Sequence, residues 1–235
     1  MSIQANSTYY ISRTPILLEK FDKDARFWDK VLIDLHGSDI ASTLVMDARW
    51  AFETLIPELP YIGGDENHLT RSLIWSAQCL ALYQALKAHG KTAAEAGKIL
   101  YDAILMKRFE PRRPMPSSKW LTPEQLKAKR QKRADRSQQR QHSADWVYYF
   151  VEGDAVAFDY GYDFTECGTQ KFYRAHGGEE FLPYYCFLDY AVSEVEGLGL
   201  SRTLTLVDGD NLCNHRFKQD RETERHWPPP FLKFE

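Results

Sequence analysis

Near the C-terminal end of the chain, residues 163–217 bring together side chains that can do chemistry. They include three of the four cysteines and are Cys167, Cys186, Asp189, Arg202, Cys213 and His215. Thiols and carboxylates act as nucleophiles, acids or bases, a histidine titrates near neutral pH, and a guanidinium binds carboxylates. This combination is more typical of a small-molecule pocket than of a packed core.

Cys186 and Asp189 are three residues apart in a predicted helix, so their side chains lie on one face within one turn. A thiol beside basic groups can have a lowered pKa and act as a nucleophile, and the alternative is a buried thiol that only packs. Asp189 lies next to Leu188 and Tyr190, where an unpaired carboxylate is costly to bury. A functional role is therefore expected for Asp189, with capping of a nearby group as the alternative.

Arg202 and Arg216 fall on neighbouring predicted strands. A guanidinium there can hold the carboxylate of a small substrate, and an exposed ion pair with an acid such as Asp163 is the alternative for either arginine. His215 alternates with Cys213 along its strand, so the two side chains share a face. His215 is a candidate acid or base, or else a partly buried histidine with satisfied hydrogen bonds.

Signatures of metal and cofactor sites are missing from the sequence. Cys167, Cys186, Cys213 and His215 lack the short Cys-x-x-Cys spacing of structural zinc sites, so no metal is expected. No phosphate loop, dinucleotide fingerprint, Gly-x-Ser-x-Gly or His-Glu-x-x-His occurs, so no cofactor is expected either.

The loop at 59–67 is a second place where a ligand is expected. It combines Pro60 with two adjacent glycines, which allow a sharp change of chain direction. We interpret it as a loop that closes over a cavity, with Tyr61 and Asn67 as candidate substrate-binding residues and Asn67 capping the next helix.

The spacing of apolar residues predicts an α+β fold, in which a helical N-terminal half packs with a C-terminal antiparallel sheet of two hairpins and inserted helices. Helices are expected at 14–36, 39–56, 68–88, 92–108, 122–141, 166–176 and 179–196. Strands are expected at 146–151, 155–164, 200–207 and 212–217.

Four parts follow from this pattern and are expected to form one compact unit. They are a helical part at 1–110, a basic helical connector at 111–144, a cysteine-bearing α+β part at 145–220 and a C-terminal tail at 221–235. The prolines at 111, 114 and 116 predict a linker, and Thr92 and Thr122 each open a capping box.

Charge is distributed unevenly. Residues 107–140 hold 12 Lys and Arg against 3 Asp and Glu, whereas the whole chain has a net charge of -3. The basic stretch has almost no aromatic residues, so its composition indicates a solvated helix face or a mobile connector, and a nucleic-acid partner is not expected.

No segment approaches the ~20 apolar residues of a membrane span, and no secretory signal precedes the first helix. Four cysteines in a chain of this length do not make a disulfide scaffold, so all four are expected to be free thiols in a reducing cytoplasm. The expected partner is a small-molecule substrate, and a homo-oligomer is compatible with the sequence.

Several of these pieces, taken in order, resemble the L-2-amino-thiazoline-4-carboxylic acid hydrolase family of bacterial proteins. The resemblance extends from about residue 8 to 218. It is carried by Leu59-Pro60-Tyr61-Ile62-Gly63-Gly64 with Asn67, Ala85-Leu86 to Gly90, Glu95-Ala96-Gly97, Asp163-Phe164-Thr165-Glu166-Cys167, Leu182-Pro183, Cys186-Phe187-Leu188-Asp189-Tyr190, Arg202-Thr203-Leu204-Thr205, Gly209, Cys213 and Arg216-Phe217.

The resemblance implies a hydrolase that opens a thiazoline ring to an N-carbamoyl-cysteine, on a route to L-cysteine. Asp189 would then be the base, Cys186 or Cys213 the acid or a covalent nucleophile, and Arg202 the residue that holds the substrate carboxylate. The chain departs from the family pattern at one point. It has Cys213-Asn214-His215-Arg216-Phe217 where Cys-Asp-Phe-Arg-Phe is expected. The resemblance alone therefore does not imply that this chain acts on the family's substrate.

Two other classes of function fit the sequence. One is a non-catalytic small-molecule-binding sensor domain. The other is an oligomerisation or interaction module that uses the basic helix. Turnover of a small cyclic amino-acid derivative separates an enzyme from both.

Overall fold

The computed structural model describes residues 8–109 and 122–231. The expected linker with prolines at 111, 114 and 116 and the last four residues of the expected tail lie outside this part of the chain. One contiguous hydrophobic core runs through the described residues, from Tyr10 near the first helix to Leu200 in the sheet.

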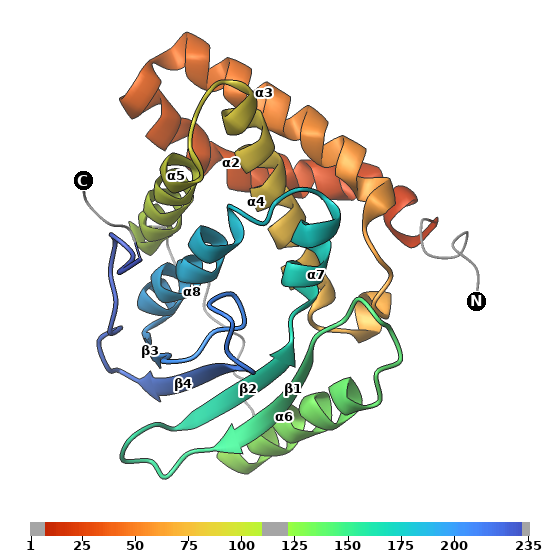
Figure 1. Ribbon diagram of the computed structural model, residues 1–235, viewed down its shortest axis with the longest axis vertical. Helices are drawn as coiled ribbons and strands as arrows, with labels where there is room; N and C mark the ends of the chain where they lie inside the picture. Colours follow the sequence, from red (N-terminus) through yellow and green to blue (C-terminus); the bar gives the residue numbers. More distant parts are fainter. Residues whose placement is uncertain (1–7, 110–121, 232–235) are drawn as a thin grey trace.

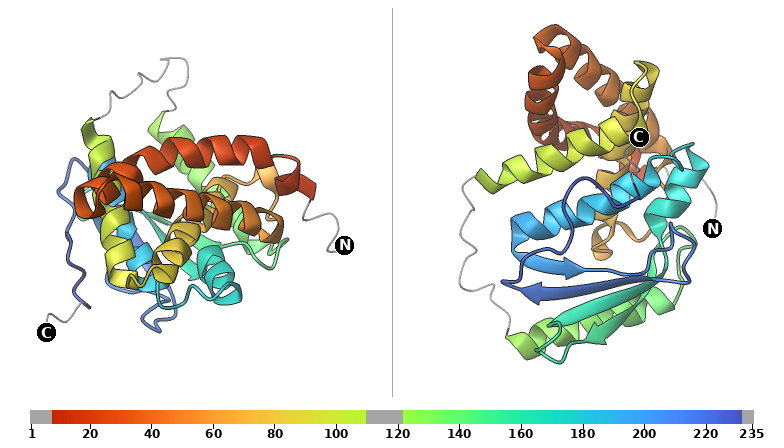
Figure 2. Two further views of the ribbon diagram at one scale, coloured as in Figure 1. Left: turned by 90° about the horizontal axis from the view of Figure 1, so that it is seen from above. Right: turned by 60° about the vertical axis from the view of Figure 1, so that its left-hand side comes forward.

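The N-terminal half is helical, as predicted. It contains α2 (Thr14–His36), α3 (Ser38–Leu55), α4 (Thr70–Ala88) and α5 (Ala93–Met106). Gly37 has a φ of 82°, which lets the chain leave α2 and start α3 at the next residue. Figure 2 shows α2 and α3 at the end of the molecule opposite the sheet.

Helix α4 forms the centre of the molecule. Its apolar residues surround the whole helix rather than one stripe, which is typical of a helix buried on all sides. It packs against α3, α5 and α7 (Gly168–Ala175). The two ends of the helix reach the surface, and the polar residues of its first turn, such as the exposed Arg71, border cavities rather than the core.

The C-terminal half contains one antiparallel sheet of four strands. The strands are β1 (Val147–Glu152), β2 (Tyr160–Glu166), β3 (Leu198–Ser201) and β4 (Cys213–Gln219). They are arranged in the order β1-β2-β4-β3, so two hairpins lie side by side with their helices inserted between them. The α+β class predicted from the sequence is confirmed.

One face of this sheet is apolar and covered, and the other is polar. Tyr148, Tyr162 and His215 point to the covered face, whereas Arg216 and Asp163 form an ion pair on the other. Two helices cover the apolar face: α8 (Leu182–Glu196) runs along β3, and the basic helix α6 (Pro123–Gln138) runs along β1 (Figure 1). Both capping boxes form, at Thr92 for α5 and Thr122 for α6.

The strand predicted at 155–164 is shorter in the structure and starts only at Tyr160. The carboxylate of Asp154 accepts hydrogen bonds from the N–H groups of Val156 and Ala157, and Ala155 has a φ of 60°. These contacts fold residues 153–159 into a loop, because an Asp side chain can replace a ladder partner for nearby backbone N–H groups.

The strand predicted at 200–207 is also wrong in its bounds, since β3 spans Leu198–Ser201. Gly197 takes the left-handed conformation with a φ of 70°, so α8 ends and β3 starts without a loop. After Ser201 the side-chain oxygen of Asn214 accepts the N–H groups of Thr203 and Leu204, which therefore leave the ladder. The expected turn after residue 207 lies within the longer loop that results.

Candidate active site

A cavity of about 510 Å³ lies between the start of α4, the helices α7 and α8, and the ends of β2 and β4. Six of the residues singled out from the sequence line it together: Cys167, Cys186, Asp189, Arg202, Cys213 and His215. They come from four separate segments of the chain, and the hairpin pairing of β3 with β4 brings the last three segments together. The predicted convergence of Cys186, Asp189, Arg202 and Cys213 on one cavity is therefore observed.

The guanidinium of Arg202 forms the buried wall of the cavity. Its Nη1 donates to Oδ2 of Asp189 at 2.9 Å, and its Nη2 donates to the carbonyl of Cys186 at 3.0 Å. The side chain is only 5% exposed. Burial opposes its charge, but the carboxylate of Asp189 and the nearby acidic side chains together outweigh this effect and raise the pKa of Arg202. Arg202 is thus a fixed positive charge that binds α8 to the end of β3.

The carboxylate of Asp189 faces the cavity. Its side chain is 45% exposed, in contrast to the buried arginine behind it. Burial by the surrounding walls raises its pKa, but the hydrogen bond with His215 and the charge of Arg202 together outweigh burial, so the pKa lies below the usual value. Asp189 is therefore ionised at neutral pH and oriented by two partners.

His215 contacts the same carboxylate from β4. Its Nε2 lies 3.3 Å from Oδ2 of Asp189 and 3.2 Å from Nη1 of Arg202. Its Nδ1 is buried and has no hydrogen-bond partner among the described residues. We assign the ring proton to Nε2, because that tautomer donates to Asp189 and leaves only an acceptor unpaired, which costs less than a buried free N–H. His215 then orients Asp189.

The three thiols of the cavity are held in the protonated form. Burial raises the pKa of Cys186 well above its usual value and that of Cys167 to about 11. Burial also raises the pKa of Cys213, although its Sγ accepts a hydrogen bond from the N–H of Leu206 at 3.1 Å. A protonated thiol is a poor nucleophile and a competent proton donor. All four cysteines are free.

Tyr61 and Asn67 do not line this cavity. The Tyr61 ring packs against Tyr9 and His142, with centroid distances of 5.5 and 5.4 Å. Asn67 is buried, and its Nδ2 donates to the carbonyl of Ile62 and to Asp145 at 2.6 and 2.7 Å. Its Oδ1 accepts the N–H of Leu69, but Leu69 itself is the N-cap of α4 and no side chain caps this helix, so the predicted cap by Asn67 is wrong.

The N-terminal half contributes residues that were not predicted for the site. Arg71 and Trp75 of α4 lie four residues apart, so they share a face that forms one wall of the cavity. The Trp75 ring lies 5.4 Å from that of Tyr185. An arginine at helical spacing from a tryptophan, on a helix otherwise rich in Ala and Leu, was the signal available in the sequence.

Arg71 differs from the other cations of the cavity wall. Lys107 pairs with Asp24 at 3.0 Å and Arg202 pairs with Asp189. Arg71 has no ion-pair partner within residues 8–109 and 122–231 and is exposed at the edge of the cavity. It is thus the guanidinium that remains available for a ligand. No group of three or more His, Cys, Asp and Glu side chains in this part of the chain is arranged to hold a metal ion.

Comparison with known families gives one match. The profile of the L-2-amino-thiazoline-4-carboxylic acid hydrolase family aligns with residues 71–217, more than half of the chain. The chain belongs to this family. The matched region contains every residue that lines the cavity except Leu69. No curated protein and no solved structure matches the chain. None of the described helices is long and apolar enough to cross a bilayer.

The two positions at which the chain departs from the expected family pattern have different locations. Asn214 lies on the polar face of β4, where its side chain binds Thr203 and Leu204. Its Nδ2 also donates to the Thr203 hydroxyl, which a carboxylate cannot do. His215 lies inside the cavity against Asp189. The first exchange therefore concerns the loop after β3, and the second concerns the site itself.

The protonated thiols give a direct test of the cavity's electrostatics. Alkylation requires the thiolate, and a pKa raised by two units lowers the thiolate fraction about 100-fold. We expect iodoacetamide at pH 8 to alkylate the native protein at least tenfold more slowly than free cysteine, as followed by intact-protein mass spectrometry. Protein unfolded in guanidinium should take up four labels. Rapid labelling of Cys186 in the native state would instead show a thiolate.

Proposed function

We propose that the chain is a hydrolase that opens a small, carboxylate-bearing heterocycle such as L-2-amino-thiazoline-4-carboxylate to an N-carbamoyl amino acid. The observation that carries this proposal is an ionised carboxylate that faces a cavity and is fixed by a buried guanidinium and an imidazole. A cavity of about 510 Å³ is of the size that takes a small metabolite. The family match supports the same class of reaction.

The reaction needs one base, one acid and a group that holds the carboxylate. The oxygen of a water molecule bonds to the ring carbon between sulfur and nitrogen, and the bond from this carbon to sulfur breaks. One proton of the water ends on the ring nitrogen and the other on the released sulfur. Each proton transfer is assisted by a side chain held within hydrogen-bond reach of the reacting atom.

Asp189 is the proposed general base. Its side chain is 45% exposed, whereas those of Arg202 and His215, which orient it, are 5% and 13% exposed. Cys186 is the proposed proton donor for the leaving sulfur, because its thiol is protonated and more exposed than that of Cys213. A covalent role for either thiol is disfavoured by the same raised pKa values.

Arg71 is the proposed partner of the substrate carboxylate. This role was expected for Arg202, but the Nη1 and Nη2 groups of Arg202 are occupied by protein atoms and its side chain is 5% exposed. Arg71 reaches the edge of the same cavity without an acid partner among the described residues. A guanidinium binds a carboxylate through two parallel hydrogen bonds, so it can fix the ring over Asp189.

Replacing Asp189 tests the base. We expect Asp189→Asn to keep the side-chain volume and reduce kcat about 10²- to 10⁴-fold, measured by mass spectrometry of the N-carbamoyl product. Asp163→Asn is the matched control, because Asp163 is a paired acid on the opposite face of the sheet. Circular dichroism checks that both variants fold. Full activity of Asp189→Asn contradicts the mechanism, and wild-type binding without turnover favours the sensor alternative.

The acid limb of the pH profile tests how Asp189 is held. A base must be deprotonated to act, so its lowered pKa keeps the enzyme active to a pH below the usual carboxyl range. We expect His215→Phe to raise the pKa of Asp189, because a hydrogen bond to its ionised form is lost. The acid limb of kcat/KM should then move to higher pH. An unchanged acid limb would show that His215 does not act on Asp189.

Removing the free guanidinium tests carboxylate binding. We expect Arg71→Gln to raise KM about tenfold while kcat changes little, because the contact is made in the ground state and the transition state alike. The same ring without its carboxylate serves as the control substrate. Wild type should bind this control poorly, and Arg71→Gln should bind it no more weakly than wild type does. An equal loss on both substrates would remove Arg71 from this role.

A further inference from the structure

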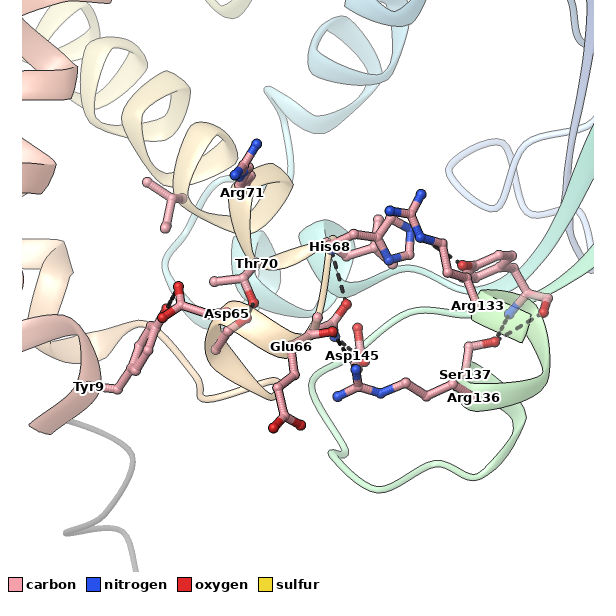
Figure 3. A pocket seen from close by; sticks show the side chains of 15 residues that line it. Tyr9, Asp65, Glu66, His68, Thr70, Arg71, Arg133, Arg136, Ser137 and Asp145 are labelled. Carbon is pink, nitrogen blue, oxygen red and sulfur yellow. Dashed lines mark hydrogen bonds between the residues drawn. The ribbon is translucent and has the colours of Figure 1, made fainter. Parts of the chain in front are cut away.

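A second cavity of about 590 Å³ lies beside the candidate active site, and the proposed function does not use it. The loop before α4 and the first turn of α4 form one wall, and the basic helix α6 forms the other. Figure 3 shows this arrangement, with His68 and Thr70 on one side and Arg133, Arg136 and Ser137 on the other. The two cavities share only Leu69 and Arg71.

The basic helix contributes two arginines to this cavity, and neither is in direct contact with an acid of the described residues. Arg133 and Arg136 are both partly buried, and neither forms an ion pair within residues 8–109 and 122–231. Arg136 donates to the carbonyl of Glu66 and packs against Gly63, which fixes the position of its guanidinium. Arg133 has no such backbone contact, so its hydrogen-bond donors remain available to a ligand.

Three acids also line the cavity, but their carboxylates are occupied or turned away. Asp65 accepts from the Tyr9 hydroxyl at 2.7 Å and pairs with Arg13 at 3.2 Å. Asp145 accepts from Asn67 at 2.7 Å and from the N–H of Trp146 at 2.8 Å. Glu66 is exposed, and Figure 3 shows its carboxylate pointing away from His68 and Arg133. None of these three carboxylates forms an ion pair with Arg133 or Arg136.

His68 lies in the cavity wall, where burial and the charges of α6 both act on its pKa. Burial, followed by the charges of Arg133, Arg136 and Lys129, lowers the pKa of His68 to about 4. Its Nε2 lies 3.4 Å from the hydroxyl of Tyr148, a buried residue that also faces the cavity. A neutral imidazole, a phenol and the guanidinium of Arg133 thus lie together, whereas Figure 3 shows the guanidinium of Arg136 turned toward Glu66. All of them can donate hydrogen bonds to an oxyanion.

We propose that this second cavity binds a small oxyanion with two negative charges, a phosphate ester or a dicarboxylate, between Arg133, His68 and Tyr148, with Arg136 as a further positive charge in the wall. The ligand would neutralise the basic face that α6 presents to the cavity, where like charges now oppose one another. Planar guanidinium groups match the oxygens of phosphate and carboxylate equally well. The geometry therefore selects a ligand by its negative charge and does not distinguish a phosphate from a carboxylate. This site is independent of hydrolysis at Asp189.

Titration calorimetry at constant ionic strength tests the site, with inorganic phosphate and succinate as the two probes. We expect saturable binding of at least one probe, and the preferred probe identifies the class of anion. Arg133→Gln should weaken that binding about tenfold or more, since a charge-assisted guanidinium contact is lost. Lys132→Gln removes the same charge from an exposed neighbouring position of α6 and should bind as wild type does.

The imidazole of His68 supplies a readout inside the cavity. We expect its pKa, followed by NMR and assigned with His68→Gln, to rise when the preferred probe binds, because a nearby anion stabilises the charged ring. Absence of saturable binding for both probes overturns the proposal. Equal weakening by Lys132→Gln would show unspecific attraction to the basic helix, and binding that leaves His68 unchanged would place the anion elsewhere. Either result also overturns it.

Discussion

The ion pair of Arg202 with Asp189 is the interaction on which the geometry of the site depends. A guanidinium that is 5% exposed has lost most of its hydration, and only a carboxylate and well-placed hydrogen bonds make that burial tolerable. Removing one partner of such a pair typically costs about 3–5 kcal/mol. The pair also joins α8 to the end of β3, and through the carbonyl of Cys186 it fixes the helix turn that carries a thiol. Electrostatics and chain geometry are therefore set by one contact.

The same environment also sets the protonation state of the thiols. Walls that bury Arg202 also desolvate Cys186 and Cys213, and burial favours the neutral form of a thiol while the ion pair keeps Asp189 charged. The cavity thus holds a fixed anion beside neutral proton donors. Groups whose pKa values are shifted in opposite directions within one pocket are typical of acid and base chemistry. A layer of aromatic rings, including Trp75 and Tyr185, encloses them.

Sequence patterns predicted which side chains lie together around the cavity wherever the spacing along one helix or strand decides their position. Helical spacing brought Cys186 and Asp189 to one face, and strand alternation did the same for Cys213 and His215. The contribution of Arg71 could not be predicted, because it depends on how a helix of the N-terminal half packs against the sheet. The strand bounds near residue 201 were missed for a related reason. Side chains such as Asn214 replace ladder partners only once the fold has formed.

The first turn of α4 separates two cavities, and the walls of these cavities differ in how much of them lies within the region matched by the family profile. The walls of the cavity around Asp189 lie almost wholly within residues 71–217, the region shared with the family. The cavity beside α6 takes a large part of its wall from Tyr9 and residues 64–70, outside that region. The family profile thus describes nearly the whole wall of the first cavity and only part of the wall of the second. A single helix turn therefore marks the border between what this chain has in common with its family profile and what lies outside it.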